Sequence, residues 1–303
     1  MGMDGAVRLP KREANTATVT ADALEAARMG FHRAQPRRSA RRVFHFTQLM
    51  VIAALFYAAI WAARVAPALS FTVAHIAAIA IFSAAIFIRL VAAAPLAPLL
   101  SRLASPARYP TYTILCPLYR EANVVPHLMV SLASLDYPQE ALDVKLLVES
   151  DDPETIAAAL AAAGNASHIE VVIIPACAPR TKPKALNVGL ARARGDFVVI
   201  YDAEDRPHAQ QLNAALAAFE DGAAELACVQ APLVIDNADE SWISRQFAAE
   251  YAIQFREMLP LLAHFKLPLP LGGTSNHFRT EVLRQCGGWD PFNVREKVRA
   301  FLA

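Results

Sequence analysis

Acidic side chains follow three apolar runs of strand length in the middle of this 303-residue chain. They are Glu121 after the first run, Glu149, Asp151 and Asp152 at the second, and Asp202, Glu204 and Asp205 at the fourth. A single cluster of this kind is typical of a helix N-cap, and Asp152 and Asp205 fit that alternative. Three clusters at one edge of a sheet repel each other unless a cation joins them. Because Mg²⁺ and Mn²⁺ combine one or two carboxylates with substrate phosphates, we expect one of these ions as cofactor.

Basic residues enter a helical pattern between the third and fourth apolar runs. The stretch reads Arg180-Thr181-Lys182-Pro183-Lys184-Ala185-Leu186-Asn187. A helix N-terminus carries a partial positive charge, so this element and the cation together indicate a site for a diphosphate. A solvated basic loop is the alternative.

Several common site motifs are absent from the sequence. There is no G-x-x-x-x-G-K-[ST], G-x-G-x-x-G or G-x-S-x-G, which disfavours P-loop NTPases, dinucleotide oxidoreductases and α/β-hydrolases. The formal net charge of +1 provides no field that would favour a nucleic-acid partner. The four cysteines are widely spaced without a C-x-x-C pair, which argues against a zinc site and fits a reducing compartment.

Apolar runs alternate with helical patterns from residue 111 onward, which predicts an α/β domain with a parallel sheet over 111–303. Strands are expected at about 112–118, 143–149, 169–174, 197–202 and 226–231, and helices at about 123–134, 154–163, 184–193 and 208–220. Ligands of such sheets bind at the carboxyl ends of the strands, where the acidic clusters lie. A further helical pattern at 241–265 is expected to pack against the sheet, in preference to lying on a membrane surface.

The first third of the chain has a different character. Residues 1–42 are rich in Ala and Arg and are expected to be a disordered basic tail, with a short helix over 21–29. Two apolar segments, 46–63 and 68–88, are each about long enough to cross a bilayer, so 43–95 is predicted as a transmembrane hairpin. A pair of buried helices in a soluble protein is the alternative. Residues 96–110 are expected to be an interfacial linker.

Arginines flank this hairpin asymmetrically. A cluster ending in Arg41 and Arg42 precedes the first segment, Arg102 and Arg108 follow the second, and Arg64 alone lies between them. The excess of positive charge places both ends of the hairpin in the cytoplasm. We therefore expect a multi-pass protein of a bacterial inner membrane with a cytoplasmic α/β domain.

Six short stretches in the order and spacing of one family resemble the catalytic domain of family 2 glycosyltransferases, especially the branch of cellulose and curdlan synthases. They are Pro117-Leu118-Tyr119-Arg120-Glu121, Glu149-Ser150-Asp151-Asp152, Lys182-Pro183-Lys184-Ala185-Leu186-Asn187, Asp202-Ala203-Glu204-Asp205-Arg206-Pro207, Gly272-Gly273-Thr274-Ser275-Asn276 and Gly287-Gly288-Trp289-Asp290-Pro291-Phe292-Asn293. The resemblance implies the GT-A fold, a Rossmann-like nucleotide-sugar domain, and a donor of the UDP-sugar type.

The resemblance also implies roles for individual residues. Tyr119 and Glu121 line the nucleotide pocket, Asp151 or Asp152 contacts the nucleoside, and Lys184 lies near the phosphates. Asp202 and Glu204 stand for the D-x-D metal site, with Glu204 in place of the usual second Asp. Residues that shape the acceptor channel are Gly272, Gly273, Trp289 and Asp290. The reaction expected of such a site is displacement with inversion at the anomeric carbon, in which the metal neutralises the departing diphosphate.

One departure from the family pattern concerns the general base. The family's T-E-D motif is expected after Asn293, but Lys297 stands where its Asp belongs, and a lysine with an ordinary pKa is protonated at pH 7. Glu296 is the remaining candidate base. The Q-x-x-R-W segment is also missing, so we expect a truncated chain with little transferase activity.

Three functions remain open at this point. The first is a membrane-bound transferase that extends a polysaccharide, with a glycan acceptor. The second is a polyprenyl-phosphate sugar transferase with a lipid-linked acceptor. The third is a non-catalytic membrane protein that binds nucleotide sugars.

Overall fold

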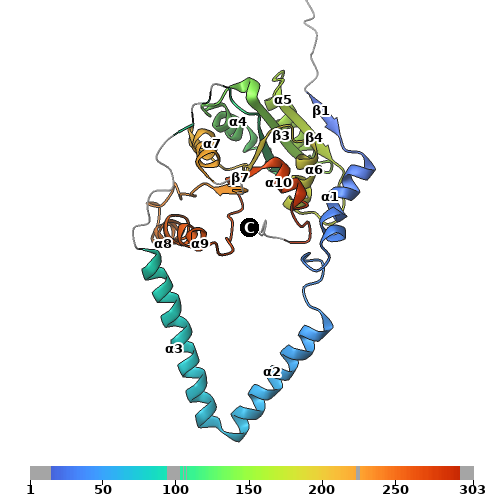
Figure 1. The fold of residues 1–303 in the computed structure, drawn as a ribbon. Coiled ribbons are helices and arrows are strands. Elements are labelled where there is room, and N and C mark those ends of the chain that lie inside the picture. The colour runs from blue at the N-terminus through green and yellow to red at the C-terminus, as the bar shows by residue number, and fades with distance from the viewer. Residues whose placement is uncertain (1–14, 94–102, 105, 107, 223–225, 294–303) are drawn as a thin grey trace, which may run out of the picture.

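The structure is a computed structural model that describes residues 15–93, 103–104, 106, 108–222 and 226–293 (Figure 1). The described residues form a seven-stranded sheet with the order β1-β4-β3-β2-β5-β7-β6. The strands are β1 (Thr16–Thr18), β2 (Tyr112–Leu118), β3 (Leu142–Glu149), β4 (Ile169–Ile174), β5 (Phe197–Ile200), β6 (Cys228–Gln230) and β7 (Asn276–Arg279). Neighbours from β1 to β5 pair in parallel, whereas β7 pairs antiparallel with both β5 and β6. The predicted α/β class and the five predicted strands are confirmed, and the sheet is mixed.

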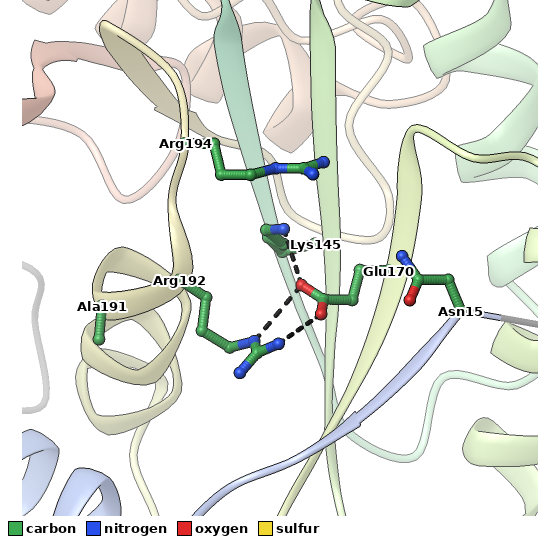
Figure 2. A pocket seen from close by; sticks show the side chains of 6 residues that line it. All are labelled: Asn15, Lys145, Glu170, Ala191, Arg192 and Arg194. Atoms are coloured by element: carbon green, nitrogen blue, oxygen red, sulfur yellow. Dashed lines mark hydrogen bonds and ion pairs between the residues drawn. The ribbon is translucent and has the colours of Figure 1, made fainter.

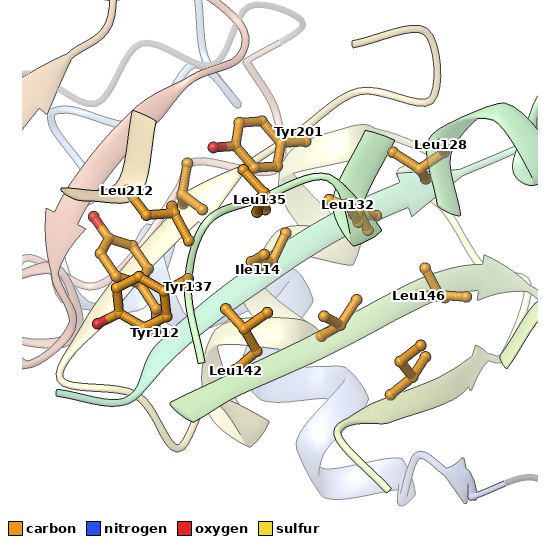
Figure 3. Close-up of a cluster of buried hydrophobic side chains, with 14 of the residues drawn as sticks. Tyr112, Ile114, Leu128, Leu132, Leu135, Tyr137, Leu142, Leu146, Tyr201 and Leu212 are labelled. Atoms are coloured by element: carbon orange, nitrogen blue, oxygen red, sulfur yellow. The ribbon is translucent and has the colours of Figure 1, made fainter. Parts of the chain in front are cut away.

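Helices cover both faces of this sheet. They are α1 (Ala21–Ala34), α4 (Val125–Ala133), α5 (Pro153–Ala163), α6 (Lys182–Arg192), α7 (Gln211–Asp221) and α10 (Thr280–Gln285), with a 3₁₀ turn η1 at Gln139–Ala141. Alternate residues of β2 face opposite sides, so that Ile114 belongs to one buried cluster and Leu115 to the other. Figure 3 shows the first cluster, in which Leu128 and Leu132 of α4 pack beside Ile114 and Leu146. Burial on both faces explains why these strands read as nearly continuous apolar runs.

Residues 15–42 are ordered, so the prediction of a disordered tail over 1–42 is wrong for this part, and residues 1–14 lie outside the described residues. Strand β1 pairs in parallel with the edge strand β4, with Thr16 opposite Val171. Helix α1 begins after Thr20, whose side chain accepts a hydrogen bond from the Ala23 amide. Its Ala27 is buried in the second cluster. Composition predicted disorder because the contacts that order this segment are made with residues more than a hundred positions away.

The two apolar segments form α2 (Phe46–Val65) and α3 (Pro67–Ala92), which extend away from the sheet as the two arms of a V (Figure 1). Both are long and apolar enough to cross a membrane by length and composition, and no residue of their most apolar windows is buried. The alternative of two buried helices is therefore contradicted. Pro67 is at the first position of α3, where a missing N–H costs no helical hydrogen bond.

The pattern at 241–265 forms three consecutive helical elements, α8 (Trp242–Ala252), the π-helix η2 (Ile253–Met258) and α9 (Leu259–His264). No residue of α8 or η2 is buried. The prediction that this segment packs into the core is thus wrong for α8 and η2, and holds only for Leu259 and Leu261 of α9.

Candidate active site

Strands β2, β3 and β5 run in parallel and end at one edge of the sheet, which we call the rim. The register sets Leu118 opposite Val148 and Leu115 opposite Ile200, so the residues that come after these strands emerge together. Burial raises the pKa of Glu121, and the charges of Glu204 and Asp202 raise it further. Glu121, Asp202 and Glu204 thus come after strands that end at the same rim, and their joint role in binding one ligand stays a prediction.

Asp202 faces a lysine from the start of α6. The Lys182 ammonium lies 2.5 Å from Asp202 Oδ1 and donates a hydrogen bond of 2.7 Å to the Gly273 carbonyl. Both side chains are partly exposed, at 24% for Lys182 and 30% for Asp202. Burial raises the pKa of Asp202 and the neighbouring Glu204 adds to this, while Lys182 opposes it. The lysine thus holds a positive charge beside the carboxylate that the sequence assigns to a metal.

Asp205 organises the loop that carries these carboxylates. It accepts a hydrogen bond of 2.7 Å from the Asp202 amide and a short one from the Thr274 hydroxyl. Burial raises the pKa of Asp205 to about 6, against the effect of the Thr274 hydrogen bond. Asp205 therefore joins the loop after β5 to the 272–275 loop, and Glu204, which is exposed, is left facing solvent at the rim.

The loop after β2 is held by the start of α5. Asp152 caps α5 by accepting from the Thr155 amide at 3.2 Å, and it also accepts from the Arg120 amide at 2.5 Å. Although burial opposes it, these hydrogen bonds hold the pKa of Asp152 below its ordinary value. Asp152 thus has the cap role that the sequence left as an alternative. Asp151 instead points to the rim, where it pairs with Arg180 at 2.5 Å.

The 272–275 loop at the rim is fixed by a residue that the sequence did not single out. The Gln230 side chain accepts a hydrogen bond of 2.8 Å from the Gly272 amide and donates to the Thr274 carbonyl at 3.1 Å. Gly272 is closely packed, since a Cβ there would lie 3.2 Å from both Gln230 Oε1 and Phe255 Cζ. Gln230 ends a short apolar strand, and no sequence pattern marks it as a bridge.

Comparison with known proteins identifies the family of the domain that carries this rim. Residues 110–298 match the family model described as "Glycosyltransferase like family 2". This chain belongs to glycosyltransferase family 2. The matched stretch contains all the carboxylates of the rim, so the family assignment rests on the same residues as the geometry.

Relatives of this family 2 chain are distant. It is 25% identical over 183 residues to "Probable glycosyltransferase YdaM" of Bacillus subtilis, a match over 60% of this chain and 43% of that protein. It is 23% identical over 189 residues to "Beta-monoglucosyldiacylglycerol synthase" of Trichormus variabilis, over 62% of this chain and 39% of that protein. The chain thus spans about two fifths of the length of these curated relatives.

Among solved structures, a mannosyltransferase from Pyrobaculum calidifontis, "PcManGT", in complex with GDP-Man and Mn²⁺ is similar to this family 2 chain. The TM-score is 0.53 at 22% identity, over 71% of this chain and 58% of that one. This likeness supports the GT-A-like fold.

Lys184 is not at the rim of the family 2 domain. Its side chain is fully buried, with the ammonium 2.8 Å from Glu149 Oε1 and 3.1 Å from the Cys177 carbonyl. Burial raises the pKa of Glu149 while Lys184 opposes this rise. Lys184 is thus held below the surface by Glu149 at the end of β3, and its place near the phosphates stays a prediction, whereas Lys182, two residues earlier, pairs with Asp202.

Trp289 and Asp290 are also buried. The Trp289 ring is only 2% exposed and packs edge-on against Phe278 at 5.9 Å, so it has no free face for a sugar. Asp290 is buried and accepts hydrogen bonds from the Ala40 amide and from Ser39 Oγ. Both side chains are packed inside the described chain, and their assignment to the acceptor channel stays a prediction.

The stretch around Trp289 is tied to α6 through Asn187. Asn187 accepts from the Trp289 amide at 2.9 Å and donates to the Trp289 carbonyl at 2.8 Å. Gly288 has φ 71°, and a Cβ there would clash with the Asn187 carboxamide. The contact between Asn187 and Trp289 thus joins the family stretches 182–187 and 287–293, and it requires glycine at position 288.

Glu296 and Lys297 lie outside the described residues, so the candidate base Glu296 stays a prediction. Gly273 lies at the rim, where its carbonyl accepts from Lys182, whereas Tyr119 flanks the rim with its ring below the Arg120 guanidinium, 5.2 Å away. Their roles toward acceptor and nucleotide also stay predictions.

The rim is well suited to an ion that arrives with a ligand. No group of three or more His, Cys, Asp or Glu side chains with metal-binding geometry occurs among the described residues. Asp202 and Glu204 nevertheless supply two carboxylates, and Mg²⁺ in proteins is commonly held by one or two carboxylates plus substrate phosphates. The residues therefore fit a divalent cation whose remaining ligands come from a diphosphate.

A separate cavity of about 320 Å³ lies away from the rim (Figure 2). Its lining residues are Asn15, Lys145, Glu170, Ala191, Arg192 and Arg194. Glu170 binds Lys145 at 2.7 Å and Arg192 at 2.5 Å, which Figure 2 marks with dashed lines. Because Glu170 is already paired with Lys145 and Arg192 and Asn15 beside β1 borders the cavity, the cavity is best explained as part of the docking of the N-terminal strand.

Proposed function

We propose that this chain is a membrane-bound inverting glycosyltransferase that takes a sugar from a nucleotide-sugar donor, most simply a UDP-sugar. The observation that supports it is the placement of Glu121, Asp202 and Glu204 after parallel strands that end at one rim, where Lys182 pairs with Asp202. The relation to a structure that holds GDP-Man and Mn²⁺ agrees with a donor of this chemical class.

Each residue of the rim has a distinct task in this proposal. Asp202 and Glu204 hold the divalent cation, which when bound offsets the charge of the departing diphosphate. With a cation bound at Asp202, Lys182 would instead pair with the phosphates, because two cations beside one carboxylate repel each other. Asp151 and Arg180 stand beside the nucleoside side of the site, and Tyr119 offers an aromatic ring to the base.

The membrane assignment rests on α2 and α3. Arg41 and Arg42 precede α2, Arg89 lies in the last turn of α3, and Arg64 alone lies at the connection between the helices. This charge pattern supports a hairpin whose two ends and α/β domain are cytoplasmic, in a bacterial inner membrane. We extend the proposal to a polysaccharide acceptor, in line with the branch of cellulose and curdlan synthases that the sequence resembles.

A lipid acceptor is the second candidate. The observation that favours it is the similarity to a protein named for the synthesis of a glucosyl-diacylglycerol. A rim carried next to two apolar helices also suits an acceptor that lies in the bilayer.

One assay separates these products. The purified full chain is incubated in lipid nanodiscs with Mn²⁺ and radiolabelled UDP-glucose, UDP-N-acetylglucosamine or GDP-mannose, and the label is followed into polymer and into chloroform-soluble lipid. The proposal expects label in one of the two fractions for at least one donor, and loss of that label with Asp202→Asn. The control is Glu281→Gln, because Glu281 is exposed on α10, beyond the end of β7 opposite the rim. Unreacted donor in every case contradicts catalysis, and nucleotide binding without turnover would then support a non-catalytic binding protein.

A further inference from the structure

Helix α8 carries an apolar surface that the domain does not cover. Trp242, Ile243 and Phe247 are 73%, 60% and 57% exposed. At about 100° per residue, the three side chains fall within an arc of about 140° on one side of the helix. An apolar patch of large side chains on a protein surface marks a place where another apolar medium or molecule binds.

The position of α8 indicates what covers this patch. Figure 1 shows α8 and α9 lying crosswise at the end of α3 that is nearer the α/β domain. The Arg89 guanidinium of α3 reaches both carboxylate oxygens of Glu250 on α8 at 3.4 Å. On α3, Leu90 next to this pair is 67% exposed. The apolar patch of α8 thus lies close to the end of a helix that is itself apolar around its whole circumference.

The segment carries as many acidic as basic side chains, Glu250 and Glu257 against Arg245 and Arg256, and Glu250 is engaged by Arg89 of α3. Exposed basic side chains accompany the apolar ones at Arg245 and Arg256, and Lys266 follows α9. Apolar and basic side chains together on a helix that lies beside a membrane span are typical of helices in the headgroup region, where cations meet anionic lipids.

We propose that α8, η2 and α9 lie along the cytoplasmic surface of the bilayer, with Trp242, Ile243 and Phe247 inserted at the boundary between headgroups and acyl chains. This inference rests on the membrane assignment of α2 and α3 in the proposed function. The partner is the lipid surface, and anionic headgroups face Arg245 and Arg256.

The segment also connects this surface to the rim. Phe255 of η2 packs against the backbone at Gly272, and the next residue, Gly273, accepts the hydrogen bond from Lys182. A helix fixed at the lipid surface therefore holds the 272–275 loop, and with it the rim, at a constant height above the bilayer. This places the site where an acceptor that emerges from the membrane can reach it.

Tryptophan fluorescence tests this position, because the chain contains only Trp61, Trp242 and Trp289. The full chain is reconstituted into vesicles of phosphatidylcholine and phosphatidylglycerol, with or without acyl chains brominated near the headgroup. Two variants are compared: Trp61→Phe, which keeps Trp242 and the buried Trp289, and Trp61→Phe/Trp242→Phe, which keeps Trp289 alone. We expect brominated lipid to quench the first variant and to leave the second unchanged, so that the quenching is lost with Trp242.

Other outcomes overturn the inference. If brominated lipid leaves Trp242 emission unchanged while acrylamide in water quenches it, the patch faces solvent and awaits a protein partner. If Trp242 is shielded from both and a cysteine at Phe247→Cys crosslinks two chains, a second copy covers it. Quenching of Trp61 in the Trp242→Phe variant reports separately on α2, so a failure of the membrane assignment is distinguished from a failure of the α8 proposal.

Discussion

Replacing Lys182 by methionine should change the affinity for a divalent cation and for a nucleoside diphosphate in opposite directions. Lys182 lies 2.5 Å from Asp202 Oδ1, so a cation that binds Asp202 must displace the ammonium. Methionine keeps most of the length and the apolar stem of the side chain but has no charge. The variant therefore frees the carboxylate for a metal without emptying the space beside it.

The magnitude depends on the exposure of the pair. Both side chains are about a quarter to a third exposed, so solvent screens their attraction and the pair is worth about 1 kcal/mol. Mn²⁺ alone should then bind Lys182→Met about fivefold more tightly. UDP in the presence of saturating Mn²⁺ should bind more weakly by a similar factor, because the phosphates lose a positively charged partner.

Paramagnetic resonance of free Mn²⁺ measures the first affinity, and calorimetric titration with UDP measures the second, both on the full chain in nanodiscs. Lys266→Met is the matched control. Lys266 is an exposed lysine that follows α9, so this substitution removes the same charge at a position outside the rim. Equal or weaker Mn²⁺ binding in Lys182→Met would refute the assignment of Asp202 as the carboxylate that exchanges lysine for metal.

Three further predictions concern the described structure. Lys184→Met should lower the free energy of unfolding by about 3 kcal/mol in denaturant, because it leaves Glu149 buried without its cation. The double variant Lys184→Met/Glu149→Leu should recover most of this loss. An unchanged free energy of unfolding in Lys184→Met would contradict a buried ion pair between Lys184 and Glu149. Asp290→Ala should release residues 39–41, so that the Ala40 amide exchanges with deuterium at least tenfold faster while amides of β3 are unchanged, and equal exchange would contradict the anchoring. Burial lowers the pKa of His277 to about 3, below its unfolded value near 6.5, so protonation favours unfolding and stability should fall by about 1.4 kcal/mol for each pH unit from 6.5 toward 3. A His277→Gln variant should lose that part of the slope, and an identical pH dependence of unfolding would exclude a neutral buried histidine.

The main strands of the domain were predictable because each is a buried apolar run. Residues 112–118 and 169–174 were assigned with the bounds that the structure gives to β2 and β4. Strand β7 was missed, since Asn276–Arg279 is short and mostly polar and is a strand only through its antiparallel partners β5 and β6. Strand β1 was missed for the same reason, as its pairing with β4 is not visible in local composition.

The candidate site was predictable as a group of carboxylates but not in its individual contacts. Parallel strands that end at one edge bring together the residues immediately after them, which is why Asp202, Glu204 and Glu121 were found. Lys182 and Lys184 have the same chemistry in a sequence, but two positions apart on a helix their side chains point about 160° apart, so only Lys182 reaches Asp202. Trp289 could stack on a sugar or fill the core, and only its contact with Phe278 decides between the two.

The exposure of α8 shows a different limit of sequence patterns. Apolar residues at helical spacing indicate an apolar face but not what that face meets. Trp242 and Phe247 would fit a sheet or a lipid surface equally well, and the structure excludes the sheet by leaving them uncovered.

Calorimetric titration of the full chain with UDP and Mn²⁺ tests the central claim most directly, namely that the rim binds a diphosphate together with a divalent cation. The account predicts that UDP binds only when Mn²⁺ is present, that Asp202→Asn abolishes this binding, and that Glu281→Gln retains it. Binding of UDP with equal affinity in the Asp202→Asn variant, or without any divalent cation, would contradict it.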